Sequence, residues 1–336
     1  MSTLSRQPSQ MPLFLTDSDV EAMSDWADAI TAIKAAYGVS GDDRRTPGRI
    51  FAQSEREWMR IMPSVPANGR LFGAKSIVGS FADGLNVSYL ITLFDKDTAD
   101  LVALVDGNRV TGLRTAATTA VGAAAITPRG PLHLGVVGSG FEARSHVTAL
   151  SHVLELASVR VYSPTAANRE RFATEVAAEL GISVRAVDTA EEAAGADVVL
   201  CAARSRDESP TVLADWIGPN ATVLSIGSTT PAQREIDTAL IGRADAVVVD
   251  TVEEVVLGSG DMLQARADGV NVEDLVVPLS DVLSGKTELK LESGIRIYKS
   301  TGSGLQDVVV AEMLVDRARA EGRGTVLPVG IVTNRK

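Results

Sequence analysis

A glycine-rich turn is the most specific chemical pattern in this sequence of 336 residues. The run Gly138-Ser139-Gly140-Phe141-Glu142-Ala143 follows an apolar stretch and opens a segment with helical spacing. Its first glycine permits a tight turn, and its second lets the backbone approach a pyrophosphate, which the N-terminus of the helix would stabilise. The pattern predicts a dinucleotide-binding site; the alternative is a tight turn in an α/β domain that binds nothing.

The residues after the next expected strand bear on the form of the dinucleotide. In NAD-binding domains this strand usually ends in an acidic residue that binds the ribose. Here Tyr162 is followed by Ser163, Pro164 and Thr165, with Arg169 nearby. Because no carboxylate would repel a 2′-phosphate, we expect NADP slightly in preference to NAD and leave both open.

Alternating strands and helices would position this turn. Apolar strands separated by helical stretches are expected at 132–137, 158–162, 183–187, 197–202, 222–226 and 246–250. Connections long enough for crossover helices predict an α/β fold with a Rossmann doubly wound parallel sheet. Ahead of it, short apolar runs are found at 49–53, 57–62, 71–78, 87–94 and 101–105. They predict a mostly antiparallel sheet in a second, α+β domain.

Three further helices are expected around these sheets. A capping box at Ser18-Asp19-Val20-Glu21 opens an amphipathic helix that ends at Gly38, an alanine-rich helix covers 111–126, and a last helix covers 305–320. Because the last helix can return to the first domain, we expect residues 1–128 and 296–336 to form one domain. Residues 129–295 would then form the Rossmann domain.

Composition excludes several classes of function. The chain has 43 acidic and 32 basic residues and a net charge of −11, which argues against binding to nucleic acid or to anionic membranes. Its one cysteine, Cys201, and three histidines form no cluster with zinc-site spacing, so no metal is expected. Because no apolar stretch is long enough for a membrane span or a signal peptide, we expect a cytoplasmic protein.

Five segments of the chain resemble the ornithine cyclodeaminase/mu-crystallin family. They are Lys75 in Gly73-Ala74-Lys75, Asp106-Gly107 through Arg114-Thr115-Ala116-Ala117, the glycine turn, Ser225-Ile226-Gly227 with Pro231 and Glu235, and Tyr298-Lys299-Ser300-Thr301-Gly302. They extend from about residue 40 to about residue 320, and the segment 114–117 is the most specific. The resemblance implies a homodimer whose N-terminal domain binds a small substrate and pairs the protomers, while a Rossmann domain holds nicotinamide.

The resemblance also implies roles for three cations. Arg49 and Lys75 match the family's substrate-binding pair and Arg114 its cofactor-contacting arginine, so we expect these three to be catalytic. An α-imino carboxylate needs a fixed cation, and guanidinium matches carboxylate geometry. Burial of Lys75 in an apolar strand would lower its pKa and let it donate a hydrogen bond or shuttle a proton. Arg44 and Arg45 compete with Arg49 for the alignment and are candidates for binding a second carboxylate.

The remaining expected contacts lie mainly in the Rossmann part. The expected cofactor-binding residues are Arg114, Thr115, Thr119, Gly138, Gly140, Phe141, Glu142, Ala143, Ser163, Thr165, Arg169, Ala202, Ser225, Ile226, Gly227, Ser228, Thr229 and Ser300. Thr301 joins Arg49 and Lys75 as an expected substrate-binding residue. For Thr115 and Thr119 the alternative is helix packing, and for the three cations it is a surface ion pair.

One departure from the family pattern reduces the number of reactions to be expected. The cyclodeaminases carry a catalytic aspartate two residues after the glycine of the fifth-strand turn, where this chain has Thr229, and a motif lysine is replaced by Gln233. Threonine cannot act as a carboxylate base, so ornithine cyclisation is disfavoured. We therefore expect an NAD(P)H-dependent reductase of a small α-imino acid, of the cyclic ketimine or iminosuccinate/iminopropionate type. The alternatives are an ornithine/lysine cyclodeaminase that releases ammonia and a non-catalytic NADP(H)-binding, crystallin-like protein.

Overall fold

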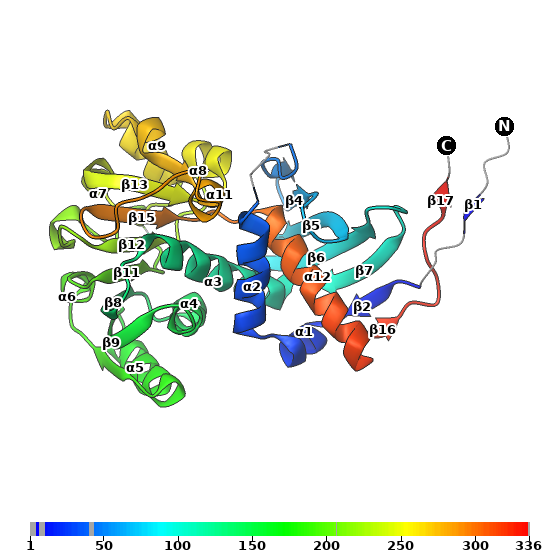
Figure 1. The fold of residues 1–336 in the computed structure, drawn as a ribbon, viewed down its shortest axis with the longest axis horizontal. Helices are drawn as coiled ribbons and strands as arrows, with labels where there is room; N and C mark the ends of the chain where they lie inside the picture. Colours follow the sequence, from blue (N-terminus) through cyan, green and yellow to red (C-terminus); the bar gives the residue numbers. More distant parts are fainter. Residues whose placement is uncertain (1–4, 7–10, 40–43, 206, 335–336) are drawn as a thin grey trace. The chain divides into compact units, whose positions relative to one another are not determined.

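A computed structural model describes residues 5–6, 11–39, 44–205 and 207–334 (Figure 1). The chain forms two compact units, Met1–Arg114 with Ser303–Lys336, and Thr115–Gly302. The divisions thus fall at 114 and 302, whereas the sequence analysis placed them at 128 and 295. The first division lies inside one continuous helix, α3 (Gly107–Ile126), which has no break in its sequence that could mark a boundary.

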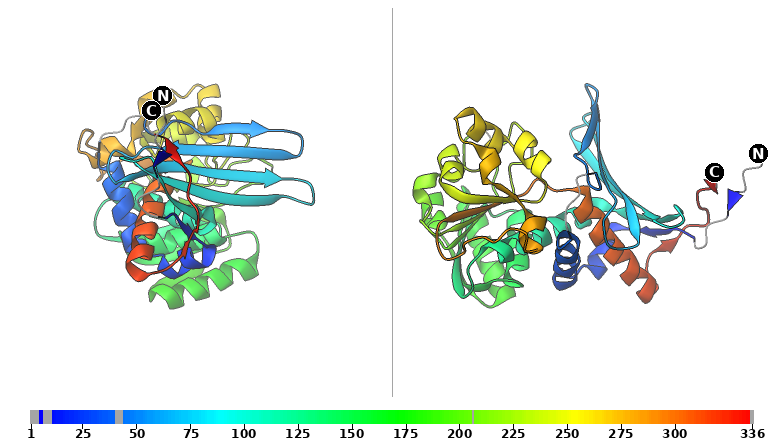
Figure 2. Two further views of the ribbon diagram at one scale, coloured as in Figure 1. Left: turned by 90° about the vertical axis from the view of Figure 1, so that its right-hand side faces the viewer. Right: turned by 45° about the horizontal axis from the view of Figure 1, so that its top comes forward.

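A seven-stranded sheet with the order β16-β2-β7-β6-β5-β4-β3 forms the framework of the first unit. Its strands are β2 (Leu13–Leu15), β3 (Ile50–Gln53), β4 (Glu57–Ser64), β5 (Leu71–Ser80), β6 (Asn86–Asp95), β7 (Leu101–Asp106) and β16 (Thr325–Val326). All neighbours are antiparallel except β2 and β7. Figure 2 shows strands β3 to β6 side by side. Strands β1 (Ser5–Arg6) and β17 (Thr333–Asn334) form a separate pair.

Three helices accompany this sheet, namely α1 (Asp17–Met23), α2 (Trp26–Tyr37) and α12 (Gly304–Glu321). The single helix expected from 18 to 38 is wrong, because Asp25 caps a new helix by accepting a hydrogen bond from the Asp28 N–H at 2.9 Å. The capping box also lies two residues earlier than expected, between Thr16 and Asp19. Helix α12 packs against α2, β4 and β5.

An eight-stranded, wholly parallel sheet with the order β10-β9-β8-β11-β12-β15-β13-β14 forms the second unit. Its strands are β8 (Pro131–Val137), β9 (Glu155–Tyr162), β10 (Ser183–Ala186), β11 (Val198–Cys201), β12 (Thr222–Ser225), β13 (Ala244–Val249), β14 (Val276–Pro278) and β15 (Ile295–Lys299). The six strands expected between residues 132 and 250 are confirmed, and so is the Rossmann-type α/β fold.

Helices cover both faces of the parallel sheet (Figure 1). They are α4 (Phe141–Ser151), α5 (Ala166–Leu180), α6 (Ala190–Ala194), the 3-10 helix η1 (Ala214–Trp216), α7 (Thr238–Arg243), α8 (Val252–Gly258), α9 (Gly260–Ala267), α10 (Val272–Leu275) and α11 (Leu279–Leu283). One face is a single apolar cluster that includes Ile241, Met262 and Ile297. On the other face, Gly122 of α3 lies so close to the Tyr298 ring that a Cβ there would be 2.5 Å from it.

Strand β15 was not expected, since 296–336 had been grouped with the first domain. Its sequence Ile-Arg-Ile-Tyr-Lys contains two charges, yet all five residues are buried between β12 and β13. Arg296 donates to the backbone carbonyls of Ser293, Gly294 and Asn220. Lys299 pairs with Asp261. Because the charged side chains of Arg296 and Lys299 are paired inside the fold, the sequence of β15 does not look like that of a buried strand.

Candidate active site

A buried ion pair joins the sheet and the last helix of the first unit. Lys75 lies in β5 with no exposed surface, and its Nζ is 2.7 Å from Oδ1 of Asp307. Asp307 is equally buried, in the first turn of α12. Lys75 also donates to Oγ1 of Thr111 at 3.3 Å. Gly304 makes this approach possible, because a Cβ there would lie 2.5 Å from the Met62 carbonyl oxygen of β4.

A second cation contacts the same carboxylate. Arg114 is 6% exposed, and its Nε lies 3.0 Å from Asp307 Oδ1. Its Nη1 donates to Oε1 of Gln306 at 2.7 Å, and Gln306 in turn donates to the Tyr37 hydroxyl at 3.0 Å. Helices α2, α3 and α12 and strand β5 therefore meet at one polar network inside an apolar region.

Positive groups outnumber carboxylates among the contacts of this network, since Lys75 and Arg114 both pair with Asp307. Burial, and next the positive charge of Arg114, lower the pKa of Lys75 to about 7, while Asp307 opposes that change. The charge of Arg49 contributes to the same lowering. The described residues include none that donates a hydrogen bond to the buried Oδ2 of Asp307. Because Lys75 and Arg114 share one carboxylate, an anionic ligand would improve the charge balance.

The structure distinguishes Arg49 from Arg44 and Arg45, which competed with it for the same alignment. Arg49 is partly buried just ahead of β3, and it is close enough to Lys75 to affect the lysine's pKa. Arg44 and Arg45 are exposed, and Arg45 donates to the Val65 carbonyl oxygen at 3.5 Å. Arg49, Lys75 and Arg114 are thus brought together, and the other two arginines remain at the surface.

Asp307, Gln306 and Tyr37 are site residues that the sequence analysis missed. Tyr37 lies near the end of the first expected helix, and Gln306 and Asp307 lie in the first turn of the last one, where helical spacing alone marks no polar site. The sequence held one signal for Asp307, because three expected cations require a carboxylate that balances their charge. Gln306-Asp307, directly after the family-like segment that ends at Gly302, was the nearest acidic candidate.

The glycine turn of the second unit fits a dinucleotide. Gly138 has φ +122°, and a Cβ on it would lie 2.4 Å from the Ala202 carbonyl oxygen, so only glycine suits this position. A Cβ on Gly140 would meet no atom within 4 Å. No side chain of the described residues caps the N-terminus of α4 at Gly140. Open backbone N–H groups at the start of an eleven-residue helix suit a pyrophosphate.

The end of β9 carries hydroxyls and one arginine. Ser139 of the turn donates to Oγ of Ser163 at 2.8 Å, which ties the turn to the end of β9. Thr165 is the N-cap residue of α5. Arg169 donates to the Ser163 carbonyl oxygen at 3.1 Å and to Asp188 at 2.7 Å. Its guanidinium therefore lies beside the segment where a ribose would be recognised, already paired with an exposed aspartate.

A second buried charge cluster supports the turn after β12. Glu235 accepts hydrogen bonds from Oγ of Ser225 at 2.7 Å and from the Gly227 N–H at 2.9 Å. Lys299 donates to the same Ser225 hydroxyl at 2.9 Å and lies 3.1 Å from Asp261. Burial raises the pKa of Glu235 to about 7, although the positive charge of Lys299 lowers it. This cluster holds the Ser225–Gly227 backbone from behind.

Asp250 fixes the turn after β15 in the same way. Its carboxylate accepts hydrogen bonds from the Ser300 hydroxyl at 2.7 Å and from the Thr301 and Gly302 N–H groups at 3.2 and 2.8 Å. Ser300 and Thr301 are both buried. Ser300 and Thr301 were expected from the sequence, whereas Asp250, which positions them, was not.

The two departures from the cyclodeaminase pattern contact each other. The Thr229 backbone N–H donates to Oε1 of Gln233 at 3.0 Å, and its hydroxyl donates to the same oxygen at 3.3 Å. Ser228 donates to the Gln233 carbonyl oxygen at 2.6 Å. Threonine and glutamine thus form one uncharged turn.

The remaining expected cofactor residues take several positions. Thr119 donates to the Thr115 carbonyl oxygen at 3.0 Å within α3, while Phe141 at the start of α4 is 67% exposed. Ala143 and Ile226 are buried, and Glu142 lies in the first turn of α4. Cys201 is buried, and burial raises the pKa of its thiol. The described residues contain no group of acidic, histidine or cysteine side chains that could hold a metal.

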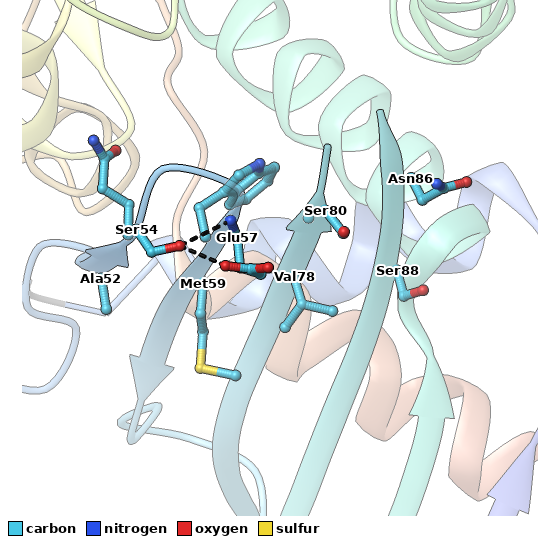
Figure 3. Close-up of a pocket in the computed structure, with 11 residues that line it drawn as sticks. Ala52, Ser54, Glu57, Met59, Val78, Ser80, Asn86 and Ser88 are labelled. Carbon is cyan, nitrogen blue, oxygen red and sulfur yellow. Dashed lines mark hydrogen bonds between the residues drawn. The ribbon is translucent and has the colours of Figure 1, made fainter. Parts of the chain in front are cut away.

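A shallow pocket lies at one end of strands β3 to β6 (Figure 3). Ser54 donates to Glu57 at its rim at 2.5 Å, and Met59, Val78 and Ser88 line it. Val78 comes three positions after Lys75 in β5, so its side chain points to the opposite face of the sheet. The residues that line the pocket do not include Lys75, Arg114 or Asp307.

Fold and site together define a class of protein that combines a Rossmann sheet with a buried cluster of cations. The chain belongs to the ornithine cyclodeaminase/mu-crystallin family, whose model matches residues 10–322. The family resemblance seen in the sequence is confirmed. Among the described helices none is long and apolar enough to cross a membrane.

Three characterised relatives illustrate this membership. The iminosuccinate reductase of Paracoccus denitrificans (strain Pd 1222) is 32% identical over 71% of this chain and 73% of that protein. The Delta(1)-pyrroline-2-carboxylate reductase of the same organism is 30% identical over 91% of this chain and 97% of that protein. The solved structure of Thermococcus litoralis Delta(1)-pyrroline-2-carboxylate reductase, in complex with NADH and L-proline, has a TM-score of 0.84 at 25% identity, covering 94% of this chain and 100% of that one.

Proposed function

We propose that this protein is an NAD(P)H-dependent reductase of a small α-imino acid, giving an L-amino acid and working in reverse as an amino-acid dehydrogenase. The relatives named above reduce imino acids, and one of them is solved with NADH. The observation that carries the proposal is the buried cluster of Lys75, Arg114 and Asp307, with Arg49 close by.

Each residue of that cluster has a chemical task. Arg49 and Arg114 bind the α-carboxylate, since guanidinium can donate two parallel hydrogen bonds to it. Lys75 has a pKa of about 7, so its Nζ can supply the proton that the imine nitrogen gains and take it back in the reverse direction. Asp307 holds both Lys75 and Arg114 in place.

The second unit would bind the nicotinamide cofactor. Gly138, Gly140 and the N-terminus of α4 would hold the pyrophosphate, and the turns at 225–229 and 300–301 would complete the site. When bound, the reduced nicotinamide supplies the hydride. Arg169 and the absence of a carboxylate at 162–165 favour NADPH, with NADH as the alternative.

The turn at Thr229 favours reduction over cyclodeamination. Release of ammonia from ornithine requires a carboxylate base at this position, and here the hydroxyl of Thr229 is bound to an amide oxygen. A reductase needs no such base, because a protonated imine already attracts hydride.

The direct test follows the absorbance of NADPH and of NADH at 340 nm. The substrates are pyrroline-2-carboxylate and piperideine-2-carboxylate, and pyruvate, glyoxylate and oxaloacetate, each with ammonia or methylamine. We expect cofactor oxidation with at least one of these imines. Ammonia release from ornithine or lysine without cofactor oxidation would support the cyclodeaminase instead, and binding of cofactor without any turnover would support a crystallin-like protein.

We also propose that the protein is a cytoplasmic homodimer whose first unit pairs the protomers. The sheet face opposite Lys75 exposes Ile50, Met59, Val78 and Leu90, and exposed apolar surface of this kind usually marks an interface. A second copy of this chain fits the family resemblance. Sedimentation equilibrium should give twice the chain mass, and Val78→Lys should shift the protein to monomer, whereas an unchanged mass would exclude this face.

A further inference from the structure

The first turn of helix α12 carries a side-chain amide that is hydrogen-bonded at both ends. Gln306 is fully buried, and its Oε1 accepts a hydrogen bond from Nη1 of Arg114 at 2.7 Å. Its Nε2 donates to the Tyr37 hydroxyl of α2 at 3.0 Å. A reversed amide would turn its NH2 group toward the guanidinium, which is also a donor. The two contacts therefore fix one orientation of the amide.

The polar side chains of this turn contact other helices. Ser303 and Gln306 have the spacing of a capping box, in which both side chains bind backbone N–H groups at the start of a helix. Among the described residues, the Ser303 side chain makes no such cap bond, and its Oγ lies 3.3 Å from the Tyr37 hydroxyl. Ser303 thus contacts α2, and Gln306 contacts both α2 and α3.

The amide differs from a carboxylate in one important respect, since it carries no charge. Arg114 lies 3.0 Å from Asp307, and Lys75 shares that carboxylate at 2.7 Å. A glutamate at position 306 could also accept a hydrogen bond from Arg114, but it would supply a second carboxylate and offset both cations with the protein's own groups. An apolar side chain there would keep the charge balance but remove the acceptor.

We infer that Gln306, held by Tyr37, is a positioning residue that orients Arg114 for the carboxylate of the substrate without offsetting its charge. This inference rests on the proposed function and deepens it. Gln306 acts through Arg114, and Tyr37 acts through Gln306.

The kinetic test compares Gln306→Glu and Gln306→Met with the wild type and with Gln264→Glu, a matched change of charge at an exposed position of α9. The substrate is whichever imine named above the wild type reduces fastest. Gln306→Glu should raise its KM about tenfold to a hundredfold, with kcat changed less than about threefold, because the binding charge is offset. Gln306→Met should raise KM about twofold to tenfold, and Gln264→Glu should match the wild type.

A second measurement needs neither substrate nor cofactor. Lys75 is influenced by the charges of Asp307, Arg114 and Arg49, and its pKa is about 7. Because the unfolded chain keeps the lysine proton to higher pH, stability measured by urea unfolding should rise from about pH 7 upwards. The carboxylate of Gln306→Glu should raise the pKa of Lys75 and move the start of this rise up by about one pH unit. Gln306→Met adds no charge and should leave it in place.

Tyr37→Phe keeps the test decisive if a buried glutamate prevents folding. It removes one hydroxyl, and we expect KM to rise about twofold to fivefold with kcat unchanged.

An unchanged KM in these variants, or an unmoved rise of stability in Gln306→Glu, would overturn the inference and leave Gln306 with a structural role only. Failure of the proposed function would be recognised separately. If no imine is reduced, the reductase is refuted, whereas the pH dependence of unfolding still decides whether Gln306 preserves the positive balance around Lys75.

Discussion

Two buried lysines in this protein lie in clusters with different charge balance. Lys75 in the first unit shares Asp307 with Arg114, so positive groups outnumber carboxylates. Lys299 in the second unit lies between Asp261 and the Ser225 hydroxyl that is bound to Glu235, and Arg234 lies 3.5 Å from the same Asp261, so two cations accompany two carboxylates. Both side chains are fully buried.

The difference lies in what completes each cluster. Around Lys299 the carboxylate oxygens accept hydrogen bonds from backbone N–H groups of Gly227, Glu235 and Ile236, which closes the cluster with the protein's own groups. Around Lys75, two cations contact one carboxylate, a balance that a bound anion would improve. The first arrangement positions a loop, and the second suits the substrate-binding role proposed above. Charge balance, more than residue type, distinguishes the two.

The largest effect is expected from removing the lysine of the positive cluster. Lys75→Met should lower kcat/KM for imine reduction about a thousandfold or more, because it removes both a proton donor and a carboxylate-binding charge. Affinity for the cofactor, measured by fluorescence titration, should change little. Turnover close to that of the wild type would remove Lys75 from the mechanism.

The second largest effect is expected from removing Asp307, the carboxylate partner of Lys75. Asp307→Asn should lower the pKa of Lys75 further below about 7, since Asp307 raises it. Proton donation needs the ammonium form, so the reductive kcat/KM of the wild type should fall as pH rises through about 7. In Asp307→Asn this fall should begin at lower pH, with about a tenfold or greater loss at pH 8. Asp307→Glu serves as the charge-preserving control, and an unmoved pH profile in Asp307→Asn would show that Asp307 has only a structural role.

Changes in the Lys299 cluster should affect stability more than turnover. Burial raises the pKa of Glu235 from 4.5 to about 7, so the folded state holds an extra proton and stability falls as pH rises across that range. Burial lowers the pKa of Lys75 from 10.5 to about 7, so the unfolded state holds the extra proton and stability rises from pH 7 upwards. Urea unfolding should therefore show a minimum near neutral pH. Glu235→Gln should flatten the acidic side by on the order of 1–3 kcal/mol, and a slope equal to that of the wild type would contradict this assignment.

The smallest effect is expected at the turn after β12. Thr229→Asp alone should not produce ornithine cyclisation, because the new carboxylate would face Oε1 of Gln233, another acceptor. Ammonia release, assayed with the Thr229→Asp and Gln233→Lys double variant alongside, would check this. Cyclisation by the single variant would show that Gln233 and the substrate pocket are no obstacle.

The sequence allowed the Rossmann part and the cations to be predicted for identifiable reasons. The glycine turn has strict backbone requirements, such as the positive φ of Gly138, and these leave a readable pattern. Asp307 could not be predicted in the same way. It reaches Lys75 only through the packing of α12, more than two hundred residues later in the chain.

The position of Asp307 in the chain also affects how the site assembles during synthesis. Lys75 and Arg114 are made first, then the whole parallel sheet, and about 190 residues separate Arg114 from its carboxylate. At typical rates of translation this interval is about 10 to 40 s. During that time Lys75 and Arg114 lack the Asp307 carboxylate that pairs with both, so the sheet of the first unit should stay loosely packed on the ribosome. The reactive centre is then completed in the last moments of synthesis, when α12 emerges.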